Sequence, residues 1–133
     1  MQEAFKLVHR DRAERSGECK VERFGRAHAE AVRAWHATFP EYRQTPLVNL
    51  KNLAQELGVA SIHVKDESYR FGLNAFKVLG GSYAIGSYIA DKIGKQISDL
   101  PYEVMTGDGV RKKIGELTFV TATDGNHGRG VAW

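Results

Sequence analysis

Apolar residues recur at helical spacing from Phe76 to Ile93, the longest such stretch of the chain. One apolar strip includes Ile85 and Ile89, and Leu79 begins a second strip on another side. A helix that is apolar on several sides is usually buried. The pattern therefore predicts a buried helix over residues 76–93.

Three shorter stretches complete the helical pattern. Ala, Val and Trp recur among polar residues from Arg26 to Thr38, which predicts a helix that ends near Pro40. Residues 50–57 fit a short helix closed by Gly58, a residue suited to the C-terminal cap. Residues 98–116 are polar, with room for one short helix.

Two stretches predict β-strands. Ser61–Lys65 carries Ile62 and Val64, and Leu117–Ala122 (LTFVTA) is mostly apolar, which is typical of a buried parallel strand. Thr45-Pro46-Leu47 is expected to be extended, because the residue before proline avoids helical angles. A loop follows each strand, at 66–73 and at 123–128, and helical character resumes at Arg129. The alternation of strands and helices predicts an α/β fold with a parallel sheet and flanking helices.

Composition restricts the class of protein. The chain has 133 residues, 42% of them apolar, which suits one domain with a core. Residues 1–25 are polar and mixed, so we expect weak order there and a domain over residues 26–133. The net charge of +3, with no dense basic run, is too small to indicate nucleic-acid binding.

The cysteine content and the two ends of the chain predict its cellular compartment and whether it is truncated. The single cysteine, Cys19, cannot form an internal disulfide and fits a reducing compartment. No apolar run resembles a signal peptide or a membrane span, so we expect a cytoplasmic protein that contacts no membrane. The chain stops at Trp133, in what reads as the start of a helix, so we expect a truncated chain.

Lys77 is the first candidate for chemistry. It lies at the third position of the predicted buried helix if Asn74 is the N-cap. A helix N-terminus and partial burial both disfavour an ammonium group, which predicts a lowered pKa. Only a neutral amine attacks an aldehyde to form a Schiff base. The alternative is a lysine whose stem packs while its head reaches solvent, and position alone favours that alternative.

The loop Thr123–Gly128 (TDGNHG) is the second candidate, because it follows a predicted strand and opens a helix. Ligands of open α/β sheets lie beyond the C-terminal strand ends, and amides at a helix start bind anions such as carboxylates. Asp124 could act as a general acid or base if burial raised its pKa. Asn126 could donate a hydrogen bond to an oxygen of a planar cofactor. The alternative is a turn in which Asp124 or Asn126 caps the helix.

Other motifs are weaker. The spacing of Gly125, Gly128 and Gly130 departs from the dinucleotide pattern G-x-G-x-x-G. His127 could be a base, but a structural hydrogen-bonded residue is the more common case. The five histidines show no metal-binding spacing, so no metal is expected. The Lys65–Glu67 segment is expected to be a solvated strand end rather than an acid–base pair.

Four segments, in this order, resemble the tryptophan-synthase-β-like enzymes that depend on pyridoxal phosphate, known as fold type II. They are TPL at 45–47, VKDES at 64–68, RFGLNAFK at 70–77 and TDGNHGRG at 123–130. The stretches RFGLNAFKVLGGSYA and TDGNHGRGVAW are similar to the diaminopropionate ammonia-lyase branch of this family. The resemblance covers about residues 30–133.

The resemblance implies a role for each matching residue. Lys77 would bind pyridoxal 5'-phosphate covalently, and Asn126 would contact its phenolic oxygen. The loop formed by Thr123, Asp124, Gly125, Asn126 and His127 would receive the substrate carboxylate. Asp124, which replaces a small residue of other branches, would be the acid–base catalyst for removal of the α-proton. The implied reaction is α,β-elimination of 2,3-diaminopropionate to pyruvate and ammonia, in an enzyme that forms a homodimer.

The resemblance also implies an incomplete, N-terminal portion of the fold. In the family, the glycine-rich loop for the cofactor phosphate, the partner of the pyridine nitrogen and a second acidic catalyst all lie later in the sequence. None of them is present in these 133 residues. We therefore expect the chain by itself to bind the cofactor weakly and to turn over little.

Three alternatives stay open at this point. The chain could be an inactive remnant, or half of a split enzyme with no catalysis of its own. It could be similar to serine or threonine ammonia-lyases, which a small residue at position 124 would have favoured. A generic α/β ligand-binding domain explains the pattern of elements, but not the joint occurrence of Lys77 and the TDGNHG loop.

Overall fold

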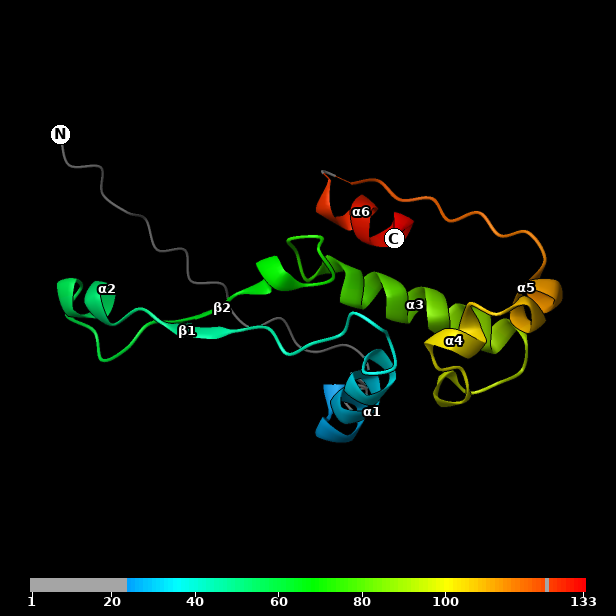
Figure 1. Cartoon of the computed structure of the whole chain (residues 1–133), viewed down its shortest axis with the longest axis horizontal. Helices are drawn as coiled ribbons and strands as arrows, with labels where there is room; N and C mark the ends of the chain where they lie inside the picture. Colours follow the sequence, from blue (N-terminus) through cyan, green and yellow to red (C-terminus); the bar gives the residue numbers. More distant parts are fainter. Residues whose placement is uncertain (1–23, 124) are drawn as a thin grey trace, which may run out of the picture.

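The computed structural model describes residues 24–123 and 125–133 (Figure 1). The predicted weak order of residues 1–25 falls almost wholly outside these ranges, as does Cys19. Within the described ranges, no helix has the length and apolar character needed to cross a membrane. The helices are α1 (Arg26–His36), α2 (Lys51–Glu56), α3 (Lys77–Lys92), α4 (Tyr102–Met105), α5 (Asp108–Ile114) and α6 (Asn126–Ala132), the strands are β1 (Leu47–Asn49) and β2 (His63–Lys65), and single 3-10 turns η2 (Glu67–Tyr69) and η3 (Ile97–Asp99) complete the list.

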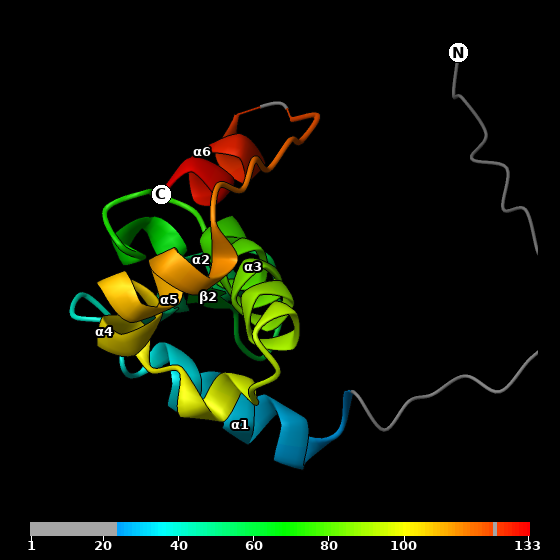
Figure 2. The same cartoon turned by 90° about the vertical axis from the view of Figure 1, so that its right-hand side faces the viewer.

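Helix α3 is the centre of the structure. Both α1 and α6 contact it, and they lie on opposite sides of it (Figure 2). The predicted helix over residues 76–93 is confirmed within one residue at each end. Its buried positions include Val78, Gly86 and Ile89, as a helix covered on several sides requires.

The core consists of two apolar clusters along α3. Trp35, Phe39, Phe71 and Val78 form the first, and Ile89, Ala90, Leu100 and Val110 form the second. The Trp35 indole lies so close to Gly86 that a Cβ atom there would be 2.8 Å from the ring. The indole Nε1 also donates a hydrogen bond to the Leu100 carbonyl over 2.9 Å. This single side chain therefore ties α1 to both α3 and the segment that follows it.

The first predicted strand is present, but its sheet is antiparallel. β1 pairs with β2 in the register Leu47↔Lys65, and α2 connects the two strands. The prediction that Gly58 closes α2 is confirmed, because its φ is +65° and its N–H donates to the Gln55 carbonyl. This hairpin extends away from α3 at one end of the molecule (Figure 1).

The predicted buried strand over Leu117–Ala122 is wrong for the described residues. The segment is extended but pairs with no strand, and Val120 is 91% exposed. A parallel strand needs a neighbour that accepts and donates ladder hydrogen bonds. In the described part of the chain, the sheet consists of β1 and β2 alone, and neither free edge pairs with this segment.

The boundaries of two other elements also differ from the prediction. The connection over residues 98–116 holds α4, α5 and the end of η3 rather than one helix. Helix α6 begins at Asn126, three residues before Arg129, which was the predicted start. The early start brings Asn126 and His127 from the predicted loop into the first turn of the helix.

Candidate functional site

A strained turn precedes Lys77. Phe71 has φ +48°, Gly72 has φ +67° and Asn74 has φ +56°. Positive φ is rare for a bulky residue such as Phe71, and such conformations persist only where the surroundings hold them. Backbone strain of this kind concentrates at functional sites.

Lys77 is the first residue of α3, not the third, and Asn74 is not its N-cap. Phe76 holds the cap position without a side-chain hydrogen bond. Asn74 adopts the left-handed conformation that asparagine tolerates, which differs from the extended angles typical of a capping asparagine. The Lys77 side chain is exposed, and its Nζ lies 5.2 Å from the centre of the Phe76 ring. We expected Lys77 to be partly buried, and in the described structure it is not.

Aromatic rings hold the strained Phe71 in place. Its ring centre lies 4.7 Å from that of Trp133 and 6.0 Å from that of Phe39. Phe71 itself is 5% exposed. Burial of this ring offsets the unfavourable backbone angle, because a large aromatic side chain contributes roughly 1.5–3 kcal/mol when removed from water.

A buried ion pair precedes the strained turn. Arg70 Nε donates to Glu67 Oε2 over 2.8 Å, and Nη2 donates to Oε1 over 3.0 Å. Thr45 Oγ1 donates to the same Oε1, and Lys65 Nζ donates to the Thr45 carbonyl. These residues, with Arg43, form a group that we call the Arg70 network. Its members come from the segment before β1, the end of β2, and η2 with the residue that follows it.

This network corrects the expectation of a solvated strand end for Glu67, whereas Lys65 is exposed as expected. Hydrogen bonds from Arg70 hold the pKa of the Glu67 carboxyl below its usual value, and the Glu67 carboxylate raises the pKa of Arg70. Asp66 Oδ1 accepts from the Ser68 amide over 3.0 Å and so caps η2. Glu67 is half-buried because its charge is neutralised by a guanidinium that is itself buried.

Helix α6 docks on the first turn of α3 through Gly130. A Cβ atom on Gly130 would lie 2.9 Å from both Val78 N and Val78 Cα, and 3.3 Å from the Lys77 carbonyl carbon. The two backbones touch at this point. The structure therefore brings the helix that carries the second candidate loop against the lysine that is the first candidate.

The Thr123 side chain, rather than that of Asn126, is seen to cap the start of α6. Its Oγ1 accepts from the Gly128 amide over 2.8 Å and from the Gly125 amide over 3.1 Å. Asn126 and His127 are exposed on the first turn. Asp124 lies outside the described residues.

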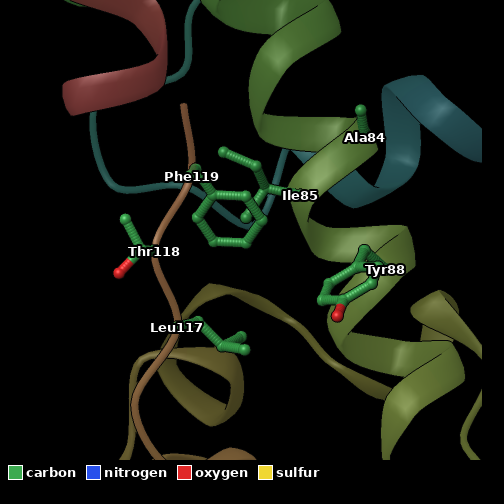
Figure 3. Close-up of a pocket in the computed structure, with 6 residues that line it drawn as sticks. All are labelled: Ala84, Ile85, Tyr88, Leu117, Thr118 and Phe119. Atoms are coloured by element: carbon green, nitrogen blue, oxygen red, sulfur yellow. The ribbon is translucent and has the colours of Figure 1, made fainter. Parts of the chain in front are cut away.

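A hollow of about 390 Å³ lies further along α3 than Lys77. Figure 3 shows Phe119 and Leu117 of the extended segment beside Ile85 and Tyr88 of the helix. The Tyr88 and Phe119 rings meet edge to face at 6.0 Å. The lining is mostly apolar and holds neither candidate segment, so this hollow is a packing groove rather than the candidate site.

The sequence predictions located both candidate segments but missed the residues that hold them. Glu67 and Arg70 are three positions apart, a spacing that places an acid and a base within reach on one helical turn. That spacing was a usable signal. The contact between the Trp133 and Phe71 rings joins residues 62 positions apart and has no local signal in the sequence.

Comparison with known proteins gives consistent results. A family model described as "Pyridoxal-phosphate dependent enzyme" matches residues 38–133. The chain is 58% identical over 102 residues to the diaminopropionate ammonia-lyase of Salmonella typhimurium, a match that covers 77% of this chain and 25% of that protein. It is 50% identical over 111 residues to the diaminopropionate ammonia-lyase of Escherichia coli K12, covering 83% of this chain and 27% of that protein.

Solved structures agree with the curated relatives. The crystal structure of Escherichia coli diaminopropionate ammonia lyase in apo form matches with a TM-score of 0.73 at 50% identity, covering 83% of this chain and 29% of that one. The same enzyme in complex with D-serine matches with a TM-score of 0.75 at 50% identity, covering 83% and 27%. The chain thus spans about a quarter of the length of the curated relatives it matches.

The family match covers most of the chain, and it includes Lys77, the strained turn and α6. The predicted fold, that of the fold type II enzymes, is confirmed by the solved structures, although its parallel sheet is not formed within the described residues. On these grounds, the chain belongs to the family of pyridoxal-phosphate dependent enzymes.

Proposed function

We propose that this chain is part of a pyridoxal-phosphate dependent lyase that eliminates ammonia from 2,3-diaminopropionate and yields pyruvate. The observation that carries this proposal is the identity of 50–58% to curated diaminopropionate ammonia-lyases over most of the chain. The contact between α6 and the first turn of α3 supports it, because it brings the elements that carry the two candidate segments together.

The residues present fit the cofactor chemically. Lys77 offers an exposed primary amine at the first turn of a helix, directly after a strained turn. We propose that this amine binds the cofactor covalently. The Asn126 amide is a suitable donor to the cofactor's phenolic oxygen. When bound, pyridoxal phosphate serves as an electron sink for the carbanion at the substrate α-carbon.

We assign the remaining roles to the loop before α6. Backbone amides within residues Thr123–His127 would bind the substrate carboxylate, since amides at a helix start favour anions. Thr123 keeps the loop closed through its two amide hydrogen bonds. Asp124 would exchange the proton at the substrate α-carbon. Glu67 is less suited to that role, because its pairing with Arg70 keeps the carboxylate occupied.

We also propose a cellular compartment and an oligomeric state for the enzyme. A single cysteine suits a reducing compartment, so we propose a cytoplasmic enzyme of amino-acid breakdown. We also propose that the enzyme is a homodimer, as the family resemblance implies. Sedimentation velocity of the enzyme with and without the cofactor would test the dimer.

The test of the cofactor assignment is an absorbance titration of the purified chain with pyridoxal phosphate, followed by borohydride reduction and peptide mapping. We expect label on Lys77 in preference to Lys92, which lies at the other end of α3. Lys77→Ala should remove the specific label, and Lys92→Ala should not. Label spread evenly over all lysines would contradict the assignment.

The activity itself is tested by pyruvate release from 2,3-diaminopropionate, compared with release from serine and threonine. The matched region is about a quarter of each curated relative, so we expect little turnover from these 133 residues alone. Release of pyruvate from serine in preference to diaminopropionate would favour a serine ammonia-lyase instead.

A further inference from the structure

We propose that Arg70 is a positioning residue for Lys77: paired with Glu67, it holds the strained turn that sets where the Lys77 amine projects. The inference rests on the proposed function, because it gives Arg70 a task in cofactor binding. Arg70 itself touches neither Lys77 nor any candidate substrate residue within the described part of the chain.

The Arg70 side chain is anchored by three residues from two segments, the one before β1 and η2. Nη1 donates to the Arg43 carbonyl over 2.9 Å, Nη2 reaches Thr45 Oγ1 at 3.3 Å, and the bidentate pair with Glu67 completes the set. Arg70 is 6% exposed. A planar guanidinium with several fixed donors is well suited to such a junction, and a lysine cannot reproduce the fork.

The Arg70 backbone closes the strained turn directly. Its carbonyl accepts from the Leu73 amide over 2.9 Å, and its own amide donates to the Glu67 carbonyl. The two residues between Arg70 and Leu73 are Phe71 and Gly72, both with positive φ. Side chain and backbone of one residue thus fix the entry of a turn that a phenylalanine does not adopt unaided.

Lys77 depends on this turn because it is the first residue of α3. Lys77 follows Leu73, the last residue of the turn, by only four positions. The residue at the N-cap, Phe76, makes no side-chain hydrogen bond to the helix start. The direction of the lysine is therefore set from the turn side rather than by preceding helical hydrogen bonds. If the turn relaxes, the amine loses its fixed position, and displacements of about 1 Å already reduce the efficiency of positioned groups.

The experiment compares acetylation of individual lysines in the native chain by peptide mapping. The measured quantity is the extent of acetylation of Lys77 divided by that of Lys92. This ratio in the native chain is compared with the same ratio in the urea-unfolded chain. The variants are Arg70→Gln, Arg70→Lys and Glu67→Gln. The matched control is Arg26→Gln, because Arg26 also pairs with a glutamate, Glu30, but on the exposed surface of α1.

We expect the native ratio of the wild-type chain to differ from the unfolded ratio, and Arg70→Gln to shift it toward the unfolded value by at least about threefold. Glu67→Gln should cause a smaller shift, and Arg26→Gln none. Circular dichroism must stay native for the shift to count. An unchanged ratio in folded Arg70→Gln overturns the proposal, as does a wild-type ratio equal to the unfolded one.

Loss of the whole fold in both Arg70 variants would also overturn it, because Arg70 would then be a structural residue of the domain. Acetylation needs no cofactor, so this test stands apart from the proposed function. If wild-type Lys77 takes no pyridoxal phosphate, the proposed function fails while the ratio still decides the role of Arg70. If wild-type Lys77 is labelled by the cofactor and Arg70→Gln is labelled equally well, only the positioning role fails.

Discussion

At the scale of single residues, two glycines decide how closely the helices approach α3. A Cβ atom at Gly86 would meet the Trp35 ring of α1, and one at Gly130 would meet the backbone of Val78. A ring can shift by a few tenths of an ångström, whereas helical backbone cannot. Gly130 is therefore the more restrictive of the two positions.

We predict that Gly130→Ala lowers the free energy of unfolding by about 1–3 kcal/mol, because the methyl group forces α6 away from α3. The matched control is Gly80→Ala, in which nothing lies within 4 Å of the new Cβ. In that variant the free energy of unfolding should rise by about 0.5–1 kcal/mol, since alanine is the better helix former. Urea titrations monitored by tryptophan fluorescence measure the free energy of unfolding of both variants. Equal urea midpoints for the two variants would contradict the prediction.

His36 is a second residue whose surroundings matter more than its type. It is buried between α1 and α3, with Nδ1 3.0 Å from the Val32 carbonyl and Nε2 3.1 Å from Ser82 Oγ. Burial lowers the pKa of His36, and the nearby Arg70 charge acts in the same direction. The folded chain therefore favours the neutral imidazole more than the unfolded chain does.

This pKa shift predicts an acid-sensitive fold. Above the unfolded value of about 6.5 both states hold neutral His36 and the full stability is present. As the pH falls through 6.5 toward the lower folded pKa, only the unfolded chain takes up the proton, so stability is lost. Urea titrations at pH 7.5 and pH 5.5 should show this loss, and His36→Gln should show less of it. An equal loss in His36→Gln would assign the effect to other groups.

At the scale of elements, α6 is a short helix that depends on its ends. Helices of seven residues are not stable alone in water. At its start, Thr123 accepts hydrogen bonds from two amides. At its end, the Trp133 ring stacks on Phe39 at 5.8 Å and lies 4.7 Å from the Phe71 ring. The element is therefore stabilised by contacts that link it to the turn before Lys77.

We predict that Thr123→Val destabilises the start of α6 by about 1 kcal/mol, because valine keeps the shape but not the acceptor. Hydrogen exchange at the Gly125 and Gly128 amides should accelerate about fivefold. Thr123→Ser should restore the slower rate. Thr121→Val is the matched control, since the Thr121 hydroxyl makes only a 3.5 Å contact with the Ala122 carbonyl. Equal acceleration in both valine variants would contradict the assignment of Thr123 as the cap.

At the scale of the whole molecule, the extended segment 117–122 is an exposed, largely apolar stretch. It is uncharged and rich in β-forming residues, and it contains Val120 at 91% exposure and Phe119 at 42%. Such a segment offers unpaired backbone groups and apolar side chains to any other extended chain. Its inner side, by contrast, packs on α3 through Leu117 and Phe119 (Figure 3).

We predict that the chain self-associates through this segment as its concentration rises. Val120→Asp should reduce that association, because a charge breaks the uncharged β-forming run. Val59→Asp is the matched control, since Val59 is an exposed valine too, at 48%, but follows the glycine that closes α2. Sedimentation velocity over a series of concentrations measures the effect. If both variants self-associate to the same extent, the association does not involve segment 117–122.

The sequence alone determined the helices with strong periodicity and the two candidate site segments. Residues 76–93 formed a helix because apolar side chains recur along several faces, and Gly58 closed α2 because its left-handed angle needs no tertiary support. The segments around Lys77 and Thr123–Gly130 stood out because their residue types and order match a known family. Local chemistry is sufficient for inferences of this kind.

The tertiary structure decided what lies around those segments. Only the folded chain shows that Arg70 is buried against Glu67 and Thr45, that Asn74 is left-handed rather than a cap, and that Gly130 rests on Val78. It also decided that 117–122 forms no strand among the described residues, because a parallel strand depends on hydrogen-bond partners that its own sequence cannot supply. These properties depend on contacts between residues far apart in the chain, and no local pattern encodes them.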